Sequence, residues 1–139
     1  MKIRAATVDD HEALCAIDTV ANTSPERREQ IRSWLDSARC CVAEVDGRIA
    51  GFGVLTRHFF GHPFIEMVMV GEAFRRQGVG AEIVRHLRSI APASKLFSST
   101  NASNVPMQKL FRSLGFERSG QVDNLDEGDP EIIFFIVNG

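Results

Sequence analysis

The sequence predicts an α/β protein in which a mixed β-sheet carries helices on both faces. An apolar run at residues 64–70, rich in β-branched side chains, precedes a glycine-containing turn and an amphipathic segment, which is the pattern of a strand followed by a helix. Asp46-Gly47 lies between two apolar segments and is the strongest short hairpin signal in the chain. Antiparallel hairpins combined with a central strand–helix unit are typical of mixed sheets with two helical layers.

The first half of the chain predicts a strand, two helices and a hairpin. Residues 2–6 form the first expected strand, and a helix runs from the acidic turn at Asp9 to about Ala21. Ser24 is placed to cap a second helix with Pro25 at its first position, and both residue types favour these positions. The apolar residues of that helix repeat at i, i+3, i+4 and i+7 and are Ile31, Trp34, Leu35 and Ala38.

The later elements follow from the same two periodicities. The hairpin strands are expected at residues 40–45 and 48–57, and a loop at 58–63, containing Gly, Pro and His, separates them from the strand at 64–70. The remaining elements, in order, are a helix from Ala81 to about Arg88, a strand at 95–100, a helix at 105–114 ended by Gly115, a strand from Phe116, an acidic loop at 123–129 and a strand at 131–137. The expected order is therefore βααβββαβαββ.

Length and composition favour one globular domain without a membrane segment. The chain has 139 residues, enough for one hydrophobic core and too few for two, so we expect a single domain over residues 1–139. The formal net charge of −2 gives no reason to expect nucleic-acid binding. No apolar run approaches the roughly 18 residues that cross a bilayer, and the residues after Met1 are not those of a signal peptide. We therefore expect a cytoplasmic protein with no nucleic-acid or membrane partner.

The turn between the strand at 64–70 and the following helix has the composition of an anion site. Gly78 and Gly80 remove side chains where the backbone enters the helix, and Arg75 and Arg76 add positive charge beside it. The first N–H groups of a helix lack intrahelical partners and lie at the positive end of its dipole, so they bind phosphate groups well. The alternative is a plain strand–helix turn with solvated arginines.

Two common phosphate motifs do not fit this turn. A P-loop requires Gly-Lys-Ser/Thr, whereas the helix here opens with Gly80-Ala81-Glu82. The dinucleotide fingerprint requires a third small residue where this chain has Ile83. The remaining pattern, Arg75-x-x-Gly78-x-Gly80 after an apolar strand, resembles the acyl-CoA pyrophosphate loop of the Gcn5-related N-acetyltransferase (GNAT) family.

Two further blocks carry the same resemblance. The opening Ile3-Arg4-x-Ala6-Thr7-x-x-Asp10 is similar to the start of GNAT proteins, and Asn104-x-x-Met107-x-x-Leu110-Phe111-x-x-Leu114-Gly115-Phe116 is similar to their second conserved block. The expected element order also looks like the whole GNAT fold, so the resemblance covers essentially the full chain. It implies an N-acetyltransferase with splayed central strands, acetyl-CoA as cosubstrate and a small-molecule or protein amine as acceptor. The oligomeric state is left open, with a homodimer among the options.

The resemblance also implies which residues bind acetyl-CoA. The pantetheine arm would pair with the backbone of the apolar strand, and the helix N–H groups with the two arginines would bind the pyrophosphate. A wall formed by the helix at 105–114 would contact the sulfur end. The residues implied in acetyl-CoA binding are Val68, Met69, Val70, Arg75, Arg76, Gln77, Gly78, Val79, Gly80, Ala81, Asn104 and Phe111.

Glu66 and Val70 are the expected catalytic residues. By resemblance, the Val70 N–H would polarise the thioester carbonyl and stabilise the oxyanion that develops on attack. An alkyl ammonium titrates near ~10, so the amine must lose a proton before it attacks. Glu66 is the only charge within the apolar strand and is the candidate general base. The alternative is a solvent-facing or salt-bridged Glu66.

Phe111 departs from the GNAT pattern, because many members have a Tyr there that protonates the departing CoA thiolate. This chain contains no Tyr. Three explanations are open: water protonates the thiolate, another side chain such as Ser103 or a cysteine does so, or the protein binds acyl-CoA without turning it over. A catalytically silent acyl-CoA-binding module is therefore the alternative to an enzyme, and a phosphate-binding structural domain is a third interpretation.

The sequence predicts no metal site and gives only a charge signal for the acceptor. His58 and His62 have a helical metal spacing but fall in an expected loop, and Cys40 and Cys41 point to opposite faces of a strand. With Cys15, these cysteines fit buried thiols in a reducing compartment. The loop between the last two strands could attract a cationic amine, with a merely solvated loop as the alternative. Its acids are Asp123, Asp126, Glu127 and Asp129.

Overall fold

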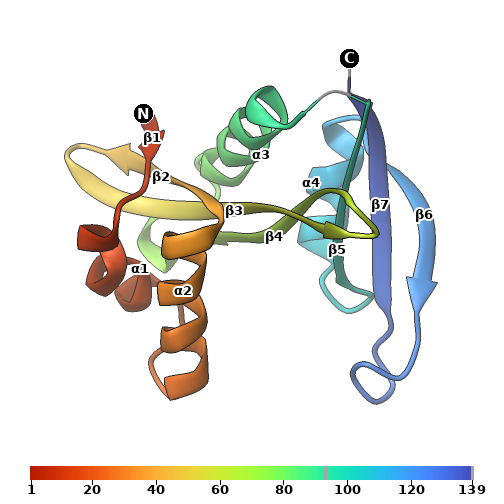
Figure 1. Ribbon diagram of the computed structural model, residues 1–139, viewed down its shortest axis with the longest axis horizontal. Coiled ribbons are helices and arrows are strands. Elements are labelled where there is room, and N and C mark those ends of the chain that lie inside the picture. Colours follow the sequence, from red (N-terminus) through yellow and green to blue (C-terminus); the bar gives the residue numbers. More distant parts are fainter. Residues whose placement is uncertain (93, 139) are drawn as a thin grey trace.

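The computed structural model describes residues 1–92 and 94–138 (Figure 1). These residues form a mixed seven-stranded sheet in the order β1-β2-β3-β4-β5-β7-β6, with helices on both faces. The strands are β1 (Lys2–Ala5), β2 (Arg39–Val45), β3 (Arg48–Phe59), β4 (His62–Val70), β5 (Ser94–Asn101), β6 (Glu117–Val122) and β7 (Glu131–Asn138). The helices are α1 (His11–Ile17), α2 (Pro25–Ser37), α3 (Val79–Ile90) and α4 (Val105–Ser113), with short 3-10 turns η1 (Val8–Asp10) and η2 (Glu72–Phe74). The predicted fold class and element order are confirmed.

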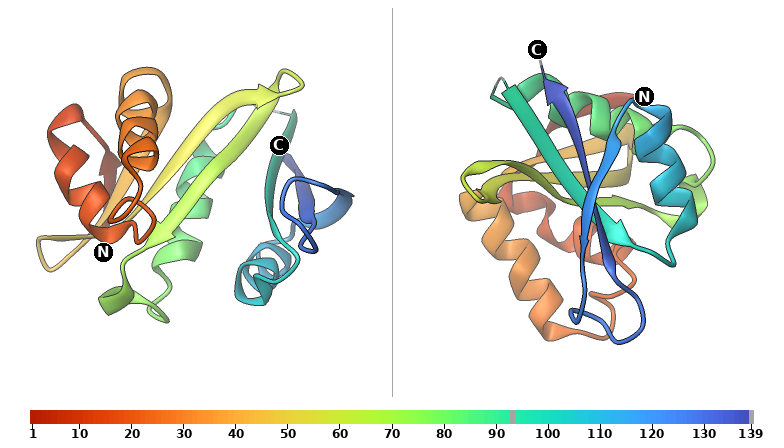
Figure 2. Two further views of the ribbon diagram at one scale, coloured as in Figure 1. Left: turned by 90° about the horizontal axis from the view of Figure 1, so that it is seen from below. Right: turned by 90° about the vertical axis from the view of Figure 1, so that its right-hand side faces the viewer.

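The central strands β4 and β5 are the one parallel pair of the described sheet, and they pair only briefly. Phe64 aligns with Phe97, and Ile65 with Ser98, and no later pair joins the two strands within the described residues. At this last pair the Ser98 hydroxyl donates to the Ile65 carbonyl oxygen over 2.9 Å. The strands then separate (Figure 2), as the resemblance implied. One edge of β4 is therefore open from Glu66 onward.

α3 lies close to the sheet because two glycines of β3 leave room for it. Ile83 and Leu87 of α3 are buried on the face that the periodicity predicted. A Cβ at Gly53 would lie 2.5 Å from Cγ2 of Ile83, and a Cβ at Gly51 would lie 3.0 Å from Cδ1 of the same residue. This close packing holds the N-terminus of α3 beside the end of β4.

α1 and α2 cover the opposite face of the sheet, but only over its N-terminal strands. Leu14 of α1 and Ile31 of α2 are buried in one cluster with Val42, Phe52 and Val54. α4 lies on the α3 side, where its Phe111 is buried in one cluster with Leu96 of β5 and Phe134 of β7. Among the described elements, no helix covers the other face of β5 and β7 (Figure 1).

The predicted end of the first helix is wrong. α1 ends at Ile17 and does not continue to Ala21. The Asp18 carboxylate accepts hydrogen bonds from the N–H groups of Val20 and Ala21 over 2.9 and 3.2 Å, which closes a local turn. Short acidic side chains compete with the helix for backbone donors in this way.

The predicted loop at 58–63 is also wrong. β3 continues to Phe59 and β4 begins at His62, so only Phe60 and Gly61 form the connection. Both residues have positive φ, 52° and 81°. Two successive residues with positive φ give a two-residue turn whose twist matches that of the flanking strands.

Candidate active site

A groove of about 670 Å³ opens between the end of β4 and the N-termini of α3 and α4. Most of the residues implied in acetyl-CoA binding line it, whereas Gln77 and Phe111 do not. The groove brings together segments that are far apart in the sequence. Its lining residues are Val68, Met69, Val70, Phe74, Arg75, Arg76, Gly78, Val79, Gly80, Ala81, Asn104, Pro106, Met107 and Leu110.

The start of α3 supplies unpaired donors at one end of the groove. Gly78 is the N-cap, with φ of 79° and no side chain to cap the helix. The first backbone bond is donated by Glu82 to the Gly78 carbonyl over 3.1 Å, so the N–H groups of residues 79–81 have no acceptor within the helix. Arg75 and Arg76 are exposed beside this turn. The end of the groove is therefore electropositive and rich in N–H donors.

Gly80 keeps the groove open between β4 and α4. A Cβ at this position would lie 3.3 Å from Cδ2 of Leu110 and 3.7 Å from Cγ2 of Val70. Because the first of these distances is tighter than ordinary van der Waals contact, any side chain here would narrow the space between the two walls. The glycine thus allows close approach of a ligand to the helix N–H groups.

The open edge of β4 directs backbone groups at the groove. The Gly71 N–H donates to the Ala50 carbonyl oxygen over 2.8 Å, which sets the phase of the β3–β4 ladder. Since hydrogen bonding alternates along an antiparallel pair, the N–H and C=O groups of Val68 and Val70 point away from β3. β5 has already separated at this level, so the N–H groups of both residues and the Val68 carbonyl are available to a ligand, whereas the Val70 carbonyl oxygen accepts from Arg75 Nε over 3.5 Å.

α4 forms the second wall of the groove. Asn104 caps this helix, since its side-chain oxygen accepts from the Met107 N–H over 3.2 Å. Met107 and Leu110 follow at helical spacing and line the groove together with Pro106 and, from η2, Phe74. Met107 and Leu110 belong to the second block of the family resemblance, but none of these four apolar residues was among those implied in acetyl-CoA binding. The shared i, i+3 spacing of Asn104, Met107 and Leu110 is the signal that could have identified two of them.

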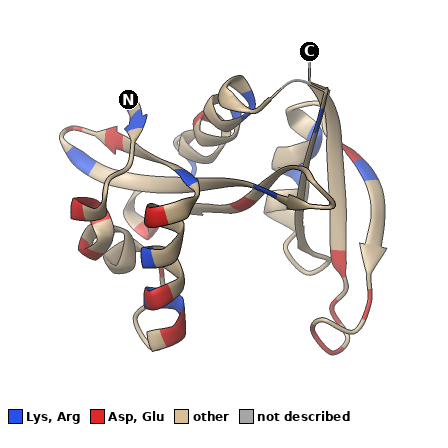
Figure 3. Ribbon diagram, in the orientation of Figure 1, with Lys and Arg blue, Asp and Glu red and all other residues tan. Residues whose placement is uncertain are grey.

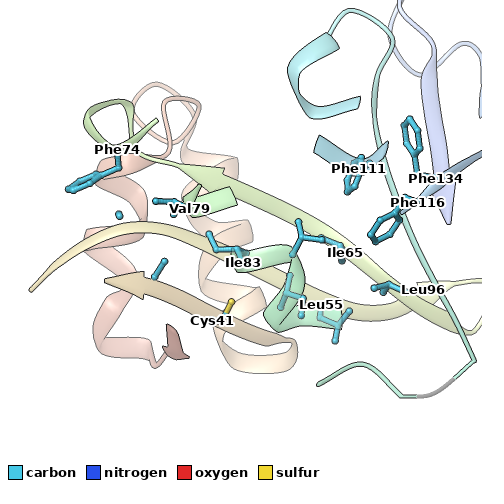
Figure 4. Close-up of a cluster of buried hydrophobic side chains, with 14 of the residues drawn as sticks. Cys41, Leu55, Ile65, Phe74, Val79, Ile83, Leu96, Phe111, Phe116 and Phe134 are labelled. Carbon is cyan, nitrogen blue, oxygen red and sulfur yellow. The ribbon is translucent and has the colours of Figure 1, made fainter. Parts of the chain in front are cut away.

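Phe111 and Gln77 lie outside the groove. Phe111 is 1% exposed, and its ring packs against Phe116 and Phe134 with both centroids 5.2 Å away (Figure 4). The Gln77 side chain is exposed and donates to the Ala73 carbonyl over 3.4 Å. The position where many GNAT members have Tyr is thus part of the hydrophobic core in this protein.

Glu66 occupies an irregular position in β4. Val54 of β3 aligns with Met67 and the next residue aligns with Ile65, so Glu66 is an extra residue that makes β4 bulge. The carboxylate is half-buried and accepts from the Thr56 hydroxyl over 3.0 Å. It does not line the groove, and no ion pair involves it within the described residues.

The acidic loop between β6 and β7 is fastened to the start of α4. Asp129 accepts from the N–H and hydroxyl of Ser103 over 2.9 and 2.6 Å, and Asp126 accepts from the Asn101 amide over 2.9 Å. Acidic residues gather in this loop and at the adjoining end of β7 (Figure 3). Three of the four loop acids therefore have hydrogen-bond partners, since Asp123 accepts from the Gln121 side-chain amide over 2.7 Å, and the fourth, Glu127, is exposed.

The described residues contain no group of three or more His, Cys, Asp or Glu side chains that could hold a metal ion. His58 lies on β3 and His62 on β4, in place of the expected loop. Among the helices that the structure describes, none is both long and apolar enough to cross a bilayer.

Comparisons with known proteins agree with this architecture. A model of the acetyltransferase (GNAT) family matches residues 7–116. A GNAT-family acetyltransferase from Bacillus cereus is 38% identical with a TM-score of 0.92, covering 99% of this chain and 97% of that one. YncA from Salmonella typhimurium, solved with its cofactor acetyl-CoA, has the same fold at 21% identity and a TM-score of 0.79, covering 100% of this chain and 94% of that one.

The curated relatives are longer proteins. Mycothiol acetyltransferase from Thermomonospora curvata is 36% identical over 111 residues, which cover 75% of this chain. The chain spans only 36% of the length of that relative. The mixed sheet with its separated central strands is the fold of these solved acetyltransferases. The chain belongs to the acetyltransferase (GNAT) family.

Proposed function

We propose that the protein is an N-acetyltransferase that moves the acetyl group of acetyl-CoA to a primary amine. The observation that carries this proposal is the groove that joins the uncapped start of α3 to the open edge of β4. Acetyl-CoA needs both features, because its pyrophosphate requires N–H donors and its pantetheine amides require backbone partners.

The groove residues fit this cosubstrate along its length. N–H groups between Gln77 and Ala81 would hold the pyrophosphate, and Arg75 and Arg76 would balance its charge. The backbone from Val68 to Val70 would pair with the pantetheine amides, and Asn104 would contact the arm from the α4 wall. The missing Cβ at Gly80 leaves room for the chain between the two walls.

The reaction would exchange a C–S bond for a C–N bond. The amine nitrogen attacks the thioester carbonyl carbon, and the Val70 N–H would donate to the developing oxyanion. Glu66 would take a proton from the ammonium, directly or through water, because only the neutral amine is nucleophilic. Water would protonate the departing thiolate, since the chain has no Tyr and Phe111 is buried. The products are an N-acetyl amine and the CoA thiol, with one net proton released.

The cysteines support water as the proton source and a reducing cytoplasm as the location. All three are unpaired in the structure, and none lines the groove. Burial raises the pKa of Cys40 to about 12 and that of Cys41 to about 11. Thiols with such pKa values stay protonated at neutral pH. Because no cysteine lines the groove, none of them is placed to give a proton to the departing CoA thiolate.

The proposal is tested by release of CoA thiol from acetyl-CoA in the presence of a panel of amines. We expect thiol release that depends on both the amine and the protein. Binding of acetyl-CoA without any amine-dependent release would favour the silent acyl-CoA-binding module. A protein that neither binds acetyl-CoA nor releases thiol would contradict both interpretations.

A further inference from the structure

Three of the six carboxylates that are buried or half-buried in the described structure have an arginine partner. Asp10 lies 2.9 Å from Arg4, and Asp18 lies 2.8 Å from Arg27. Glu44 also contacts Arg4, at 3.2 Å. Each arginine replaces hydration that the carboxylate loses on burial.

Glu66 on β4 and Glu131 on β7 lack such a partner. Both are half-buried, and each accepts from a single hydroxyl, that of Thr56 at 3.0 Å and that of Ser99 at 2.7 Å respectively. The Asp129 carboxylate, by contrast, accepts two hydrogen bonds from one neighbour. No Lys, Arg or His forms an ion pair with Glu66 or Glu131 in the part of the chain that the structure describes. The negative charge of each carboxylate is therefore not balanced by a cationic side chain of the described residues.

The two carboxylates flank the point where β4 and β5 separate. Glu66 and Ser99 are the residues that follow the last pair of these strands. Leu96 belongs to the core cluster under α3 and α4, so Ser99, three residues further along β5, faces the other side of the sheet. Glu131 accepts a hydrogen bond from Ser99 and lies on that side as well.

Glu66 faces the same side. Val54 of β3 packs in the cluster formed with α1 and α2, and Thr56, two residues later, points in the same direction. The Glu66 carboxylate, which accepts a hydrogen bond from Thr56, thus lies on one face of the sheet. The α4 wall, where Met107 and Leu110 line the groove, lies on the other face. A thioester would reach the gap between the strands from one face of the sheet and an amine from the other.

We propose that Glu66 and Glu131 form a two-carboxylate acceptor site, and that the acceptor is a diamine or polyamine with two cationic nitrogens. This inference rests on the proposed function. Glu66 receives the reacting amine, and Glu131, held by Ser99, binds the second cation. Ile133 lies directly opposite Ser99 on the neighbouring strand, and Phe97 lies two residues before Ser99 on the same face. The half-buried Phe97 offers apolar contact to the carbon chain between the nitrogens, whereas Ile133 is only 8% exposed and contributes little.

The test is Glu131→Gln, which removes the charge but retains an oxygen that can accept from Ser99. Initial rates of thiol release are measured with 1,4-diaminobutane and with butylamine at saturating acetyl-CoA. The wild type should prefer the diamine, and the variant should lose at least about tenfold of that preference in kcat/KM, through a raised KM for the diamine. Glu117→Gln, an exposed acid on β6, should keep the wild-type preference.

A second variant, Ser99→Ala, should weaken the diamine preference to a smaller degree, because Glu131 would keep its charge but lose its hydroxyl donor. Equal losses for both amines in Glu131→Gln would overturn the inference, and so would a wild type without diamine preference. If the wild type acetylates no amine, the proposed function fails. Calorimetric titration of the diamine into the CoA-loaded protein then decides the inference, which stands only if Glu131→Gln weakens binding.

Discussion

Glu66 is distinguished by its backbone as well as by its side chain. The bulge in β4 turns this residue toward the face where Thr56 can donate to it, and bulges commonly re-aim side chains beside active sites. The sequence predicts Glu66 as the candidate base because it interrupts an apolar strand. The bulge and the Thr56 contact depend on how β3 and β4 align, so they could not be predicted from the strand alone.

Glu66→Gln should lower kcat for amine acetylation by about 10²–10⁴-fold, because general-base help is lost. The Kd for acetyl-CoA should stay close to the wild-type value, since Glu66 does not line the groove. Thiol-release kinetics and calorimetry measure the two quantities. Glu117→Gln, an exposed strand residue on β6, is the control. A wild-type kcat in Glu66→Gln would show that another group removes the proton.

Asp10 provides a test of the structure through pH. The Arg4 guanidinium, with help from the Thr7 N–H, lowers the pKa of the Asp10 carboxyl. A lowered folded-state pKa stabilises the fold above the unfolded pKa of roughly 4, and this stabilisation disappears as pH falls through the folded value. Asp10→Asn should therefore cost roughly 1–2 kcal/mol at pH 7, after allowance for the exposure of Arg4, and progressively less below pH ~4.

Urea unfolding of both proteins between pH 2 and pH 7 measures this difference. Glu12→Gln is a matched control, because Glu12 and Arg28 form an exposed ion pair at 2.9 Å, and it should show a smaller pH dependence. A constant gap between wild type and Asp10→Asn over the whole range would contradict the Arg4–Asp10 contact.

Among the elements, α3 and α4 must approach each other closely to form the groove, and Gly80 allows this. Gly80→Val should reduce acetyl-CoA affinity at least about tenfold, because the side chain would occupy space beside Leu110. Gly80→Val combined with Leu110→Ala should recover part of that loss. Calorimetry measures both affinities, and an unchanged affinity in Gly80→Val would place the ligand elsewhere.

The elements also show which sequence signals are sufficient. The α3 stripe, the Ser24–Pro25 helix start and the Asp46-Gly47 hairpin were predicted, because each depends on local chemistry. The end of α1 and the Phe60-Gly61 turn were not. The first depends on where the Asp18 carboxylate points, and the second places a bulky residue at positive φ, which sequence alone does not favour.

At the scale of the whole molecule, the two faces of the sheet carry different groups at the point where β4 separates from β5. The groove with its N–H donors lies on the α3 and α4 side, and the carboxylates of Glu66 and Glu131 lie on the other. The element order predicted the splay through family resemblance. It did not predict that Phe111 is in the core or that Glu131 has no ion-pair partner among the described residues, since both depend on packing between distant segments. A homodimer stays a prediction.

Thermal unfolding with and without acetyl-CoA, with ATP and NAD as controls, tests the central claim that the groove binds acetyl-CoA. A ligand at 100 times its Kd adds about 2.7 kcal/mol to the folded state. Gly78→Glu and Gly47→Glu form a matched pair, because both glycines have positive φ, at +79° and +74°, and open space where a Cβ would lie. We expect acetyl-CoA to raise the melting temperature of the wild type and of Gly47→Glu, but not that of Gly78→Glu. No shift in the wild type at millimolar acetyl-CoA, or an equal shift in both variants, would contradict the claim.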